Sequence, residues 1–192
     1  MLEDLGIVGI SWRQNGSEAL GRFALPEDSA PVRLAQFAER AALSELAYLE
    51  TCNRVEIIFS RTTETPARDI RPQVYELLTG RPSAAGEAER SLKAWQGEGA
   101  CEHLFLGAAG LDSAAVGEAE IVGQVRACQE FALDLGLRGP RLELMVEEAL
   151  RIAAEVRGET ALGEGRVSRA EIAVKHLQER LSRTPGRLAL LG

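Results

Sequence analysis

The sequence predicts an α+β fold in which strands and helices alternate first and helices alone follow. In roughly the first half of the chain, short apolar runs that include β-branched residues are typical of buried strands. Elsewhere, apolar residues recur at spacings of three and four, which is typical of helices with one buried face. At 192 residues, the chain is long enough to bury a sizeable hydrophobic core.

The first half predicts four strands and two helices in the order β-α-β-β-α-β. The strands are expected at 5–11, 47–50, 55–60 and 91–96, and the helices at 31–42 and 69–79. The stretch 83–90 is small and polar, so we expect a surface loop there. This element order is that of a ferredoxin-like sandwich.

The second half predicts helices, expected at 100–109, 121–135, 140–157 and 167–182. We therefore expect one domain at 1–157, with a sheet part at 1–98 and a helical part at 99–157. A connecting helical segment would follow at 158–185.

The last residues, Arg187 to Gly192 (RLALLG), follow a Thr-Pro-Gly break and predict a buried strand that ends on glycine. On the residues alone, a terminal edge strand is the simpler interpretation. The first strand of a Rossmann dinucleotide-binding domain also ends in this way, and that interpretation stays open.

Composition excludes several classes of protein. Hydrophobic residues make up 45% and charged residues 27% of the chain, which is ordinary for a globular protein. No apolar run is long enough to cross a bilayer, and the acidic start lacks the pattern of a secretory signal. We therefore expect a cytoplasmic protein with no membrane partner. The net charge of −7 argues against tight independent binding of a polynucleotide.

The cysteines predict free thiols and no metal site. Cys52, Cys101 and Cys128 form no CxxC pair, so we expect reduced thiols. The two histidines, His103 and His176, supply few ligands for a zinc site. Cys101 and Cys128 fall on or near apolar faces of predicted helices, which indicates a place in the core.

Cys52 lies in the short polar connection 51–54 between two predicted strands. A lone cysteine in a cytosolic protein is usually a small buried hydrophobe. Arg54, two residues away, would instead stabilise a thiolate, the reactive form of the side chain. The surrounding polar residues either orient a substrate or solvate the turn, and the residues alone leave both interpretations open.

Two further places carry polar residues within predicted helices. His103 is either a helix residue with a local partner or a group for proton transfer near neutral pH. Glu118 and Glu120 suit the first turn of a helix as ordinary dipole partners. Gln124 lies one turn beyond Glu120 on the same face, so a binding wall is the alternative interpretation.

Four segments together resemble the glutamyl-tRNA reductase family. They are 51–56 (TCNRVE), 103–105 (HLF), 110–113 (GLDS) and 116–125 (VGEAEIVGQV). Their order and spacing also match, and the likeness is strongest from 49 to 157. The combination is specific, whereas no single segment is.

The resemblance implies NADPH-dependent reduction of glutamyl-tRNA(Glu) to glutamate-1-semialdehyde, the first step of five-carbon tetrapyrrole biosynthesis. It implies Cys52 as the nucleophile that takes the glutamyl group as a thioester, with His103 as a proton donor or acceptor. The substrate-binding residues that it implies are Thr51, Asn53, Arg54, Ser113, Glu118, Ala119, Glu120 and Gln124. Gly192 matches the opening glycine of the NADPH site, so the resemblance favours the start of a truncated NADPH-binding domain at 186–192.

The partners that the resemblance implies are tRNA(Glu) charged with glutamate and, for a pathway contact, glutamate-1-semialdehyde aminomutase. The family forms a homodimer through a C-terminal domain, which this chain is expected to lack. A chain without most of the NADPH domain is expected to cleave the ester without reducing it.

The chain departs from the family's pattern at a few positions. Trp12 stands where the family usually has histidine, Gly16 follows in the same departing segment, Glu120 replaces glutamine and Ala161 replaces aspartate. These departures motivate an alternative, a non-catalytic relative that binds tRNA or a pathway partner. A second alternative is an unrelated thiol hydrolase or acyltransferase that uses Cys52 and His103.

Overall fold

Four strands among the described residues form one antiparallel sheet. The computed structural model describes residues 2–16, 20–61, 67–113, 120–160, 169–183 and 186. The strands are β1 (Leu5–Ser11), β2 (Leu43–Glu50), β3 (Arg54–Arg61) and β4 (Lys93–Gln96). They lie in the order β2-β3-β1-β4, and each pair of neighbours is antiparallel.

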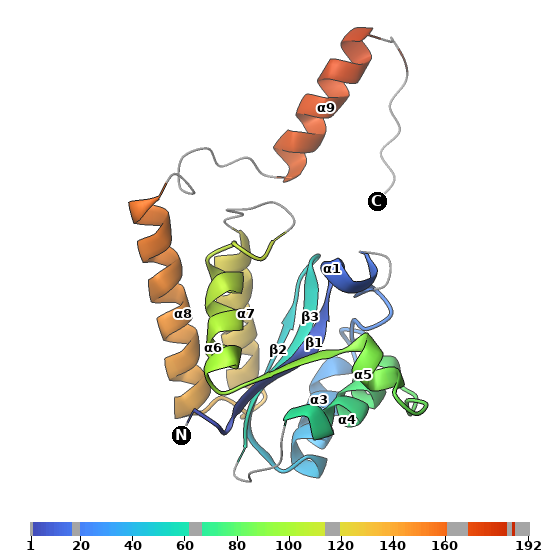
Figure 1. Ribbon diagram of the computed structural model, residues 1–192, viewed down its shortest axis with the longest axis vertical. Coiled ribbons are helices and arrows are strands. Elements are labelled where there is room, and N and C mark those ends of the chain that lie inside the picture. The colour runs from blue at the N-terminus through green and yellow to red at the C-terminus, as the bar shows by residue number, and fades with distance from the viewer. Residues whose placement is uncertain are drawn as a thin grey trace.

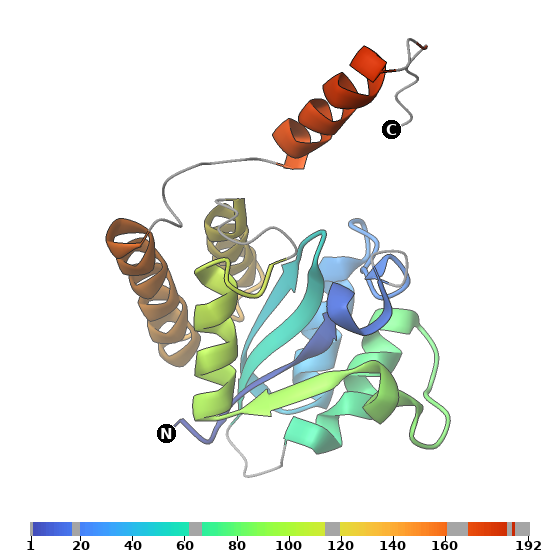
Figure 2. The ribbon, with the colours of Figure 1, turned by 45° about the horizontal axis from the view of Figure 1, so that its top comes forward.

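Helices cover both faces of the sheet (Figure 1). One face is covered by α3 (Ala30–Arg40) and α4 (Ala67–Thr79), with the short α5 (Glu87–Ser91) beside them. The other face is covered by α6 (Glu98–Ala108), α7 (Glu120–Asp134) and α8 (Pro140–Glu159). The short α1 (Trp12–Asn15) directly follows β1, and α9 (Arg169–Arg183) lies apart from both helix layers in Figures 1 and 2.

The alternation of side chains along the strands divides the core into two layers. Leu34 of α3 and Val74 of α4 share one cluster with Val8 and Ile57. Leu104 of α6, Val125 of α7 and Val146 of α8 share the other cluster with Ile7 and Ile58. Successive residues of a strand point to opposite faces, so each strand contributes to both layers.

The central strand β3 is buried along its whole length, but its two faces differ. Val55, Ile57 and Phe59 belong to the cluster under α3 and α4. The alternating residues Arg54 and Glu56 point toward the layer of α6, where they are 2% and 1% exposed. Arg54 and Glu56 therefore enter the core as neighbouring opposite charges on this face. On the other face, the buried Arg61 lies at the end of the strand with its guanidinium over the ring of Phe59.

Helix α8 is attached to the sheet through a buried carboxylate of β2. Glu45 is 5% exposed and accepts hydrogen bonds from the backbone N–H groups of Leu142 (2.6 Å) and Arg141 (3.3 Å). These donors lie in the first turn of α8, where no backbone partner exists within the helix. A carboxylate at this end also complements the helix dipole.

The mixed α and β composition expected from the sequence is confirmed, and the expected strands and helices lie at or near their expected positions. One expectation was wrong, because α5 occupies part of the stretch 83–90 that was expected to be a loop. Glu87 stabilises this short helix, since its carboxylate accepts the backbone N–H of Ala84 (2.8 Å) and lies in the first turn.

Several expectations fall outside the described residues. They include the site residues Glu118 and Ala119, the departure at Ala161, and the strand at 187–192 with Gly192. In the part of the chain that the structure describes, no helix combines the length and the apolar character needed to span a bilayer.

Candidate active site

The turn between β2 and β3 presents Cys52 to solvent. Thr51 shapes this turn, because its hydroxyl oxygen accepts the backbone N–H groups of Asn53 (3.0 Å) and Arg54 (3.1 Å). The backbone N–H of Trp12 at the start of α1 donates to the carbonyl of Asn53 (2.8 Å). Asn53 is buried and Cys52 is exposed. Thr51 and Asn53 therefore belong to the scaffold of the turn, and the thiol stands on its outer side.

The other two thiols are withdrawn from solvent, as expected from the sequence. Cys128 is buried in the layer of α6 to α8, and burial together with the charge of Glu56 raises its pKa to about 12. Cys101 is half-buried, and its pKa is raised by burial and by Glu98. Of the three cysteines, Cys52 alone is exposed.

Arg54 does not reach into solvent but lies between two carboxylates. Its Nη2 donates to the backbone carbonyl of Asp112 (2.9 Å) and lies 3.3 Å from the Asp112 carboxylate. Its Nη1 lies 3.6 Å from Oε1 of Glu56. Gly107 of α6 leaves room for this arrangement, since a Cβ there would lie 2.7 Å from Arg54 Nη1.

His103 of α6 is buried against the same strand. Its Nε2 lies 2.7 Å from Oε1 of Glu56, and its ring stacks on Trp95 of β4 with centroids 3.7 Å apart and planes 12° from parallel. The partner of His103 is therefore remote in sequence, 47 residues away, and not a neighbour on its own helix. Glu56 thus joins Arg54 and His103 into one buried network.

Asp112 connects this network to the surface. Its Oδ1 accepts a hydrogen bond from Nε of Arg13 (2.8 Å), whose side chain is 51% exposed. The next residue, Ser113, is buried. The arrangement therefore runs from an exposed arginine through Asp112 to the buried Arg54.

The remaining predicted site residues are only partly placed. Glu120 at the start of α7 is exposed, and Gln124 one turn later is half-buried. Glu118, Ala119 and Gly192 lie outside the described residues. In both ribbon views, the β2–β3 turn, α1, the end of α6 and the start of α7 lie toward the same end of the sheet (Figures 1 and 2). The segments that carry the predicted site therefore converge there.

Reasoning from sequence missed four residues that complete this network: Glu56, Asp112, Arg13 and Trp95. One signal was available, because Arg54 and Glu56 alternate with apolar residues in a strand that otherwise reads as buried. Two charges on one face of a buried strand require partners from the elements packed on that face.

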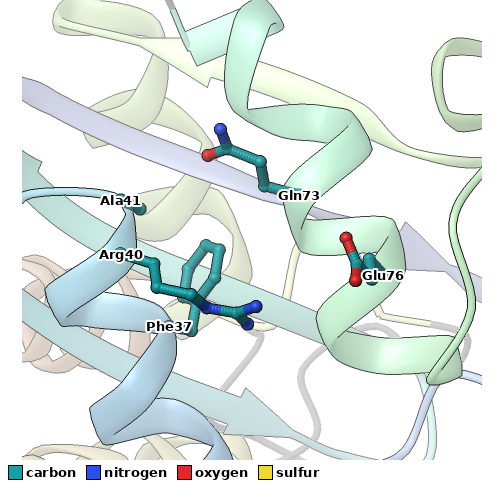
Figure 3. Close-up of a pocket in the computed structure, with 5 residues that line it drawn as sticks. All are labelled: Phe37, Arg40, Ala41, Gln73 and Glu76. Carbon is teal, nitrogen blue, oxygen red and sulfur yellow. The ribbon is translucent and has the colours of Figure 1, made fainter.

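A separate pocket lies between α3 and α4, on the opposite side of the sheet (Figure 3). Its volume is about 190 Å³, and it is lined by Phe37, Arg40, Ala41, Gln73 and Glu76. None of the predicted site residues lines it, so it is not part of the candidate active site. Among the described residues, no group of three or more His, Cys, Asp or Glu side chains is placed to hold a metal ion.

Comparison with known proteins identifies the family. The family model described as "Glutamyl-tRNAGlu reductase, N-terminal domain" matches residues 8–160. The chain belongs to this family. It is 32% identical over 191 residues to the glutamyl-tRNA reductase of Ignicoccus hospitalis, which covers 100% of this chain and 42% of that protein.

Two other relatives support the same family assignment. The glutamyl-tRNA reductase of Syntrophus aciditrophicus is 31% identical over 186 residues, which cover 96% of this chain and 44% of that protein. The solved structure of the glutamyl-tRNA reductase from Methanopyrus kandleri has a TM-score of 0.71 and 32% identity, over 93% of this chain and 40% of that chain. This chain therefore spans less than half the length of these relatives.

Proposed function

We propose that this chain is the catalytic domain of a glutamyl-tRNA reductase, which takes the glutamyl group from glutamyl-tRNA(Glu) onto Cys52. The observation that carries the proposal is the exposure of Cys52 on a hydrogen-bonded turn next to Arg54, which belongs to the buried network with Glu56 and His103. Membership of the family supports the assignment of this thiol as the nucleophile.

The chemistry within reach of this chain is acyl transfer. The sulfur of Cys52 attacks the carbonyl carbon of the ester, a carbon–sulfur bond forms, and the bond between that carbon and the ribose oxygen of the tRNA breaks. The proton of the thiol passes to the released ribose oxygen, and His103 assists this transfer. A thioester suits a following step, because thiolate is a good leaving group.

Binding of the glutamyl group is proposed to involve Arg54, Ser113, Glu118 to Glu120 and Gln124. Arg54 already lies between two carboxylates, those of Asp112 and the buried Glu56. A substrate carboxylate would therefore displace Asp112 from Arg54 or bind the exposed Arg13 beside it. A guanidinium suits either task because it offers two parallel donors to a carboxylate.

NADPH would supply the hydride that reduces the thioester to the aldehyde of glutamate-1-semialdehyde. Gly192 is the residue of this chain proposed for the NADPH site, and it lies outside the described residues. We propose that the domain comprises residues 1–157, with 158–185 connecting it to an NADPH-binding domain that starts at 186–192.

The same proposal extends to fold class and partners. We propose that the sheet part is ferredoxin-like. The strand order β2-β3-β1-β4 and the two helices on one face support this class. A homodimer formed through a C-terminal domain, a contact with glutamate-1-semialdehyde aminomutase and a cytoplasmic location are proposed from the family likeness.

The decisive experiment incubates the chain with glutamyl-tRNA(Glu) and follows both a covalent glutamyl adduct and the release of free glutamate. We expect ester cleavage without reduction, since a thioester that receives no hydride is hydrolysed by water. Cys52→Ser is expected to reduce cleavage to the spontaneous rate.

Cys101→Ser is the matched control, because it removes a half-buried thiol and leaves the turn intact. It is expected to cleave like the wild type. Equal rates for Cys52→Ser and the wild type would refute the nucleophile. Binding of the charged tRNA without cleavage by the wild type would favour the non-catalytic relative, and Trp12 beside the turn motivates that alternative.

A further inference from the structure

Glu56 is the least exposed charged residue of the candidate site, and its position is closely defined. It is 1% exposed and pairs in the ladder with Gly9 of β1. A Cβ on Gly9 would lie 2.7 Å from Cγ of Glu56, so the absence of a side chain at Gly9 makes room for this carboxylate. A buried carboxylate costs free energy unless charged and hydrogen-bonded groups compensate it.

Three titratable or charged groups face Glu56 from the elements packed against it. Arg54 lies on the same strand, His103 comes from α6, and Cys128 comes from α7. Oε1 of Glu56 contacts both Arg54 and His103, whereas Oε2 has no hydrogen-bond partner among the described residues. A single oxygen of Glu56, Oε1, therefore makes both contacts and connects Arg54 to His103.

The contact with Glu56 determines which nitrogen of His103 carries the proton. An ionised carboxylate only accepts hydrogen bonds, so Nε2 of His103 must donate across the 2.7 Å contact. The stacked Trp95 fixes the plane of the ring. With Nε2 committed to Glu56, Nδ1 is the remaining nitrogen that can accept or release a proton.

We propose that Glu56 is a positioning residue that holds His103 in the Nε2-protonated form and leaves Nδ1 to exchange protons with the reacting groups. This inference rests on the proposed function, because it deepens the part that His103 plays in acyl transfer. Glu56 does not touch the substrate and acts through His103.

The test is NMR of the imidazole nitrogens, which is simple in a chain with two histidines. His176→Gln assigns the two sets of signals. In the wild type with a neutral His103, we expect the Nε2–H form, and a dominant Nδ1–H form would overturn the proposal. This measurement needs no change at Glu56, so it stands even where Glu56 variants fold poorly.

Substitution of Glu56 gives the second readout. Glu56→Gln keeps the shape but replaces a group that only accepts hydrogen bonds by an amide that both donates and accepts, so the preference of neutral His103 for the Nε2–H form is expected to weaken. The rate of ester cleavage is expected to fall with it. An unchanged ratio of the two tautomers in folded Glu56→Gln would overturn the proposal.

Glu45→Gln is the matched control, because Glu45 is also a buried carboxylate of this sheet but binds the backbone of α8. It is expected to lower stability and to leave the ratio of the two His103 tautomers unchanged. A change of the same size in both variants would show a general effect of charge loss and would overturn the specific role of Glu56. The NMR measurements need no tRNA, whereas the test of Cys52 as nucleophile does. Failure of the proposed function and failure of the role of Glu56 can therefore be told apart.

Discussion

Both faces of the sheet are covered by helices, but their chemistry differs. Under α3 and α4, the side chains of β3 are Val55, Ile57 and Phe59, with the buried Arg61 at the end of the strand over the Phe59 ring. Under α6, the same strand carries Arg54 and Glu56, both almost fully buried. One strand therefore contributes mainly apolar packing on one side and two adjoining opposite charges on the other.

The difference shows where the molecule accepts a cost in stability. Burial of apolar side chains stabilises the fold, whereas buried charges at best compensate one another. The charged face retains two buried atoms, Nε of Arg54 and Oε2 of Glu56, that have no hydrogen-bond partner among the described residues. A face that carries this cost is the expected place for a functional site, and the apolar face is not.

Among the substitutions that test this difference between the two faces, removal of Arg54 should lower stability most. Arg54→Met leaves the carboxylates of Glu56 and Asp112 without their shared buried cation, so we expect a loss of about 3–5 kcal/mol in the free energy of unfolding. Urea denaturation measures it. Arg13→Met is the control, because Arg13 binds the same Asp112 from an exposed position and should cost at most about 1 kcal/mol. Equal losses would remove the distinction between the buried and the exposed arginine.

A cavity in the apolar face should lower stability without touching the chemistry. Leu34 is fully buried, and Leu34→Ala is expected to cost about 2–5 kcal/mol. Under conditions where the variant remains folded, its rate of ester cleavage should equal that of the wild type. A large loss of cleavage by the folded variant would mean that the two faces are coupled.

A methyl group directed at Arg54 should disturb the charged face selectively. Gly107→Ala places a Cβ 2.7 Å from Arg54 Nη1, and we expect a loss of about 1–3 kcal/mol with slower ester cleavage. Gly99→Ala in the same helix meets nothing within 4 Å and should be neutral or stabilising by up to about 1 kcal/mol. Thermal unfolding of both variants measures these changes in stability. A stable, fully active Gly107→Ala would contradict the close packing of Arg54 against Gly107.

The smallest effect concerns Cys128 at high pH. Because burial raises its pKa in the folded chain from about 9 to about 12, its unfolded thiol ionises first. The protonated Cys128 thiol of the folded chain thus makes its full contribution to stability below pH 9. This contribution is lost as the pH rises toward 12. Cys128→Ala should lose less stability than the wild type between pH 8 and pH 10, by about 1 kcal/mol. Parallel losses of the urea midpoint in the two proteins would contradict this.

Much of the fold is predictable from the sequence because its signals are local. The two apolar runs around Cys52 predict two strands and a tight turn, and the structure has β2, the turn and β3 there. The helix at 87–91 was missed, because its small polar residues resemble a loop and it has no side-chain cap. The local signal was Glu87 alone, which lies in the first turn and accepts the backbone N–H of Ala84 before the helix.

The site was less predictable, because its contacts are remote in sequence. The family pattern indicated Arg54 as a substrate contact, but no local signal shows that Asp112 already binds it. Likewise, His103 has its partner on β3, and only the packing of α6 on the sheet brings the two together. The sequence thus indicated the candidate site residues but not the side chains that contact them.

The carboxylate of Glu45 has a consequence for how the chain acquires its structure. The first turn of α8 finds its acceptor 97 residues earlier, on β2, so this helix end is satisfied only when the sheet is already formed. Arg141 strengthens the same junction by binding Asp4 of the N-terminal segment (2.9 Å). We therefore expect the sheet and the helices α6 to α8 to fold and unfold as one cooperative unit, with α8 docking late. A cut between the sheet and these helices is therefore expected to destabilise both pieces.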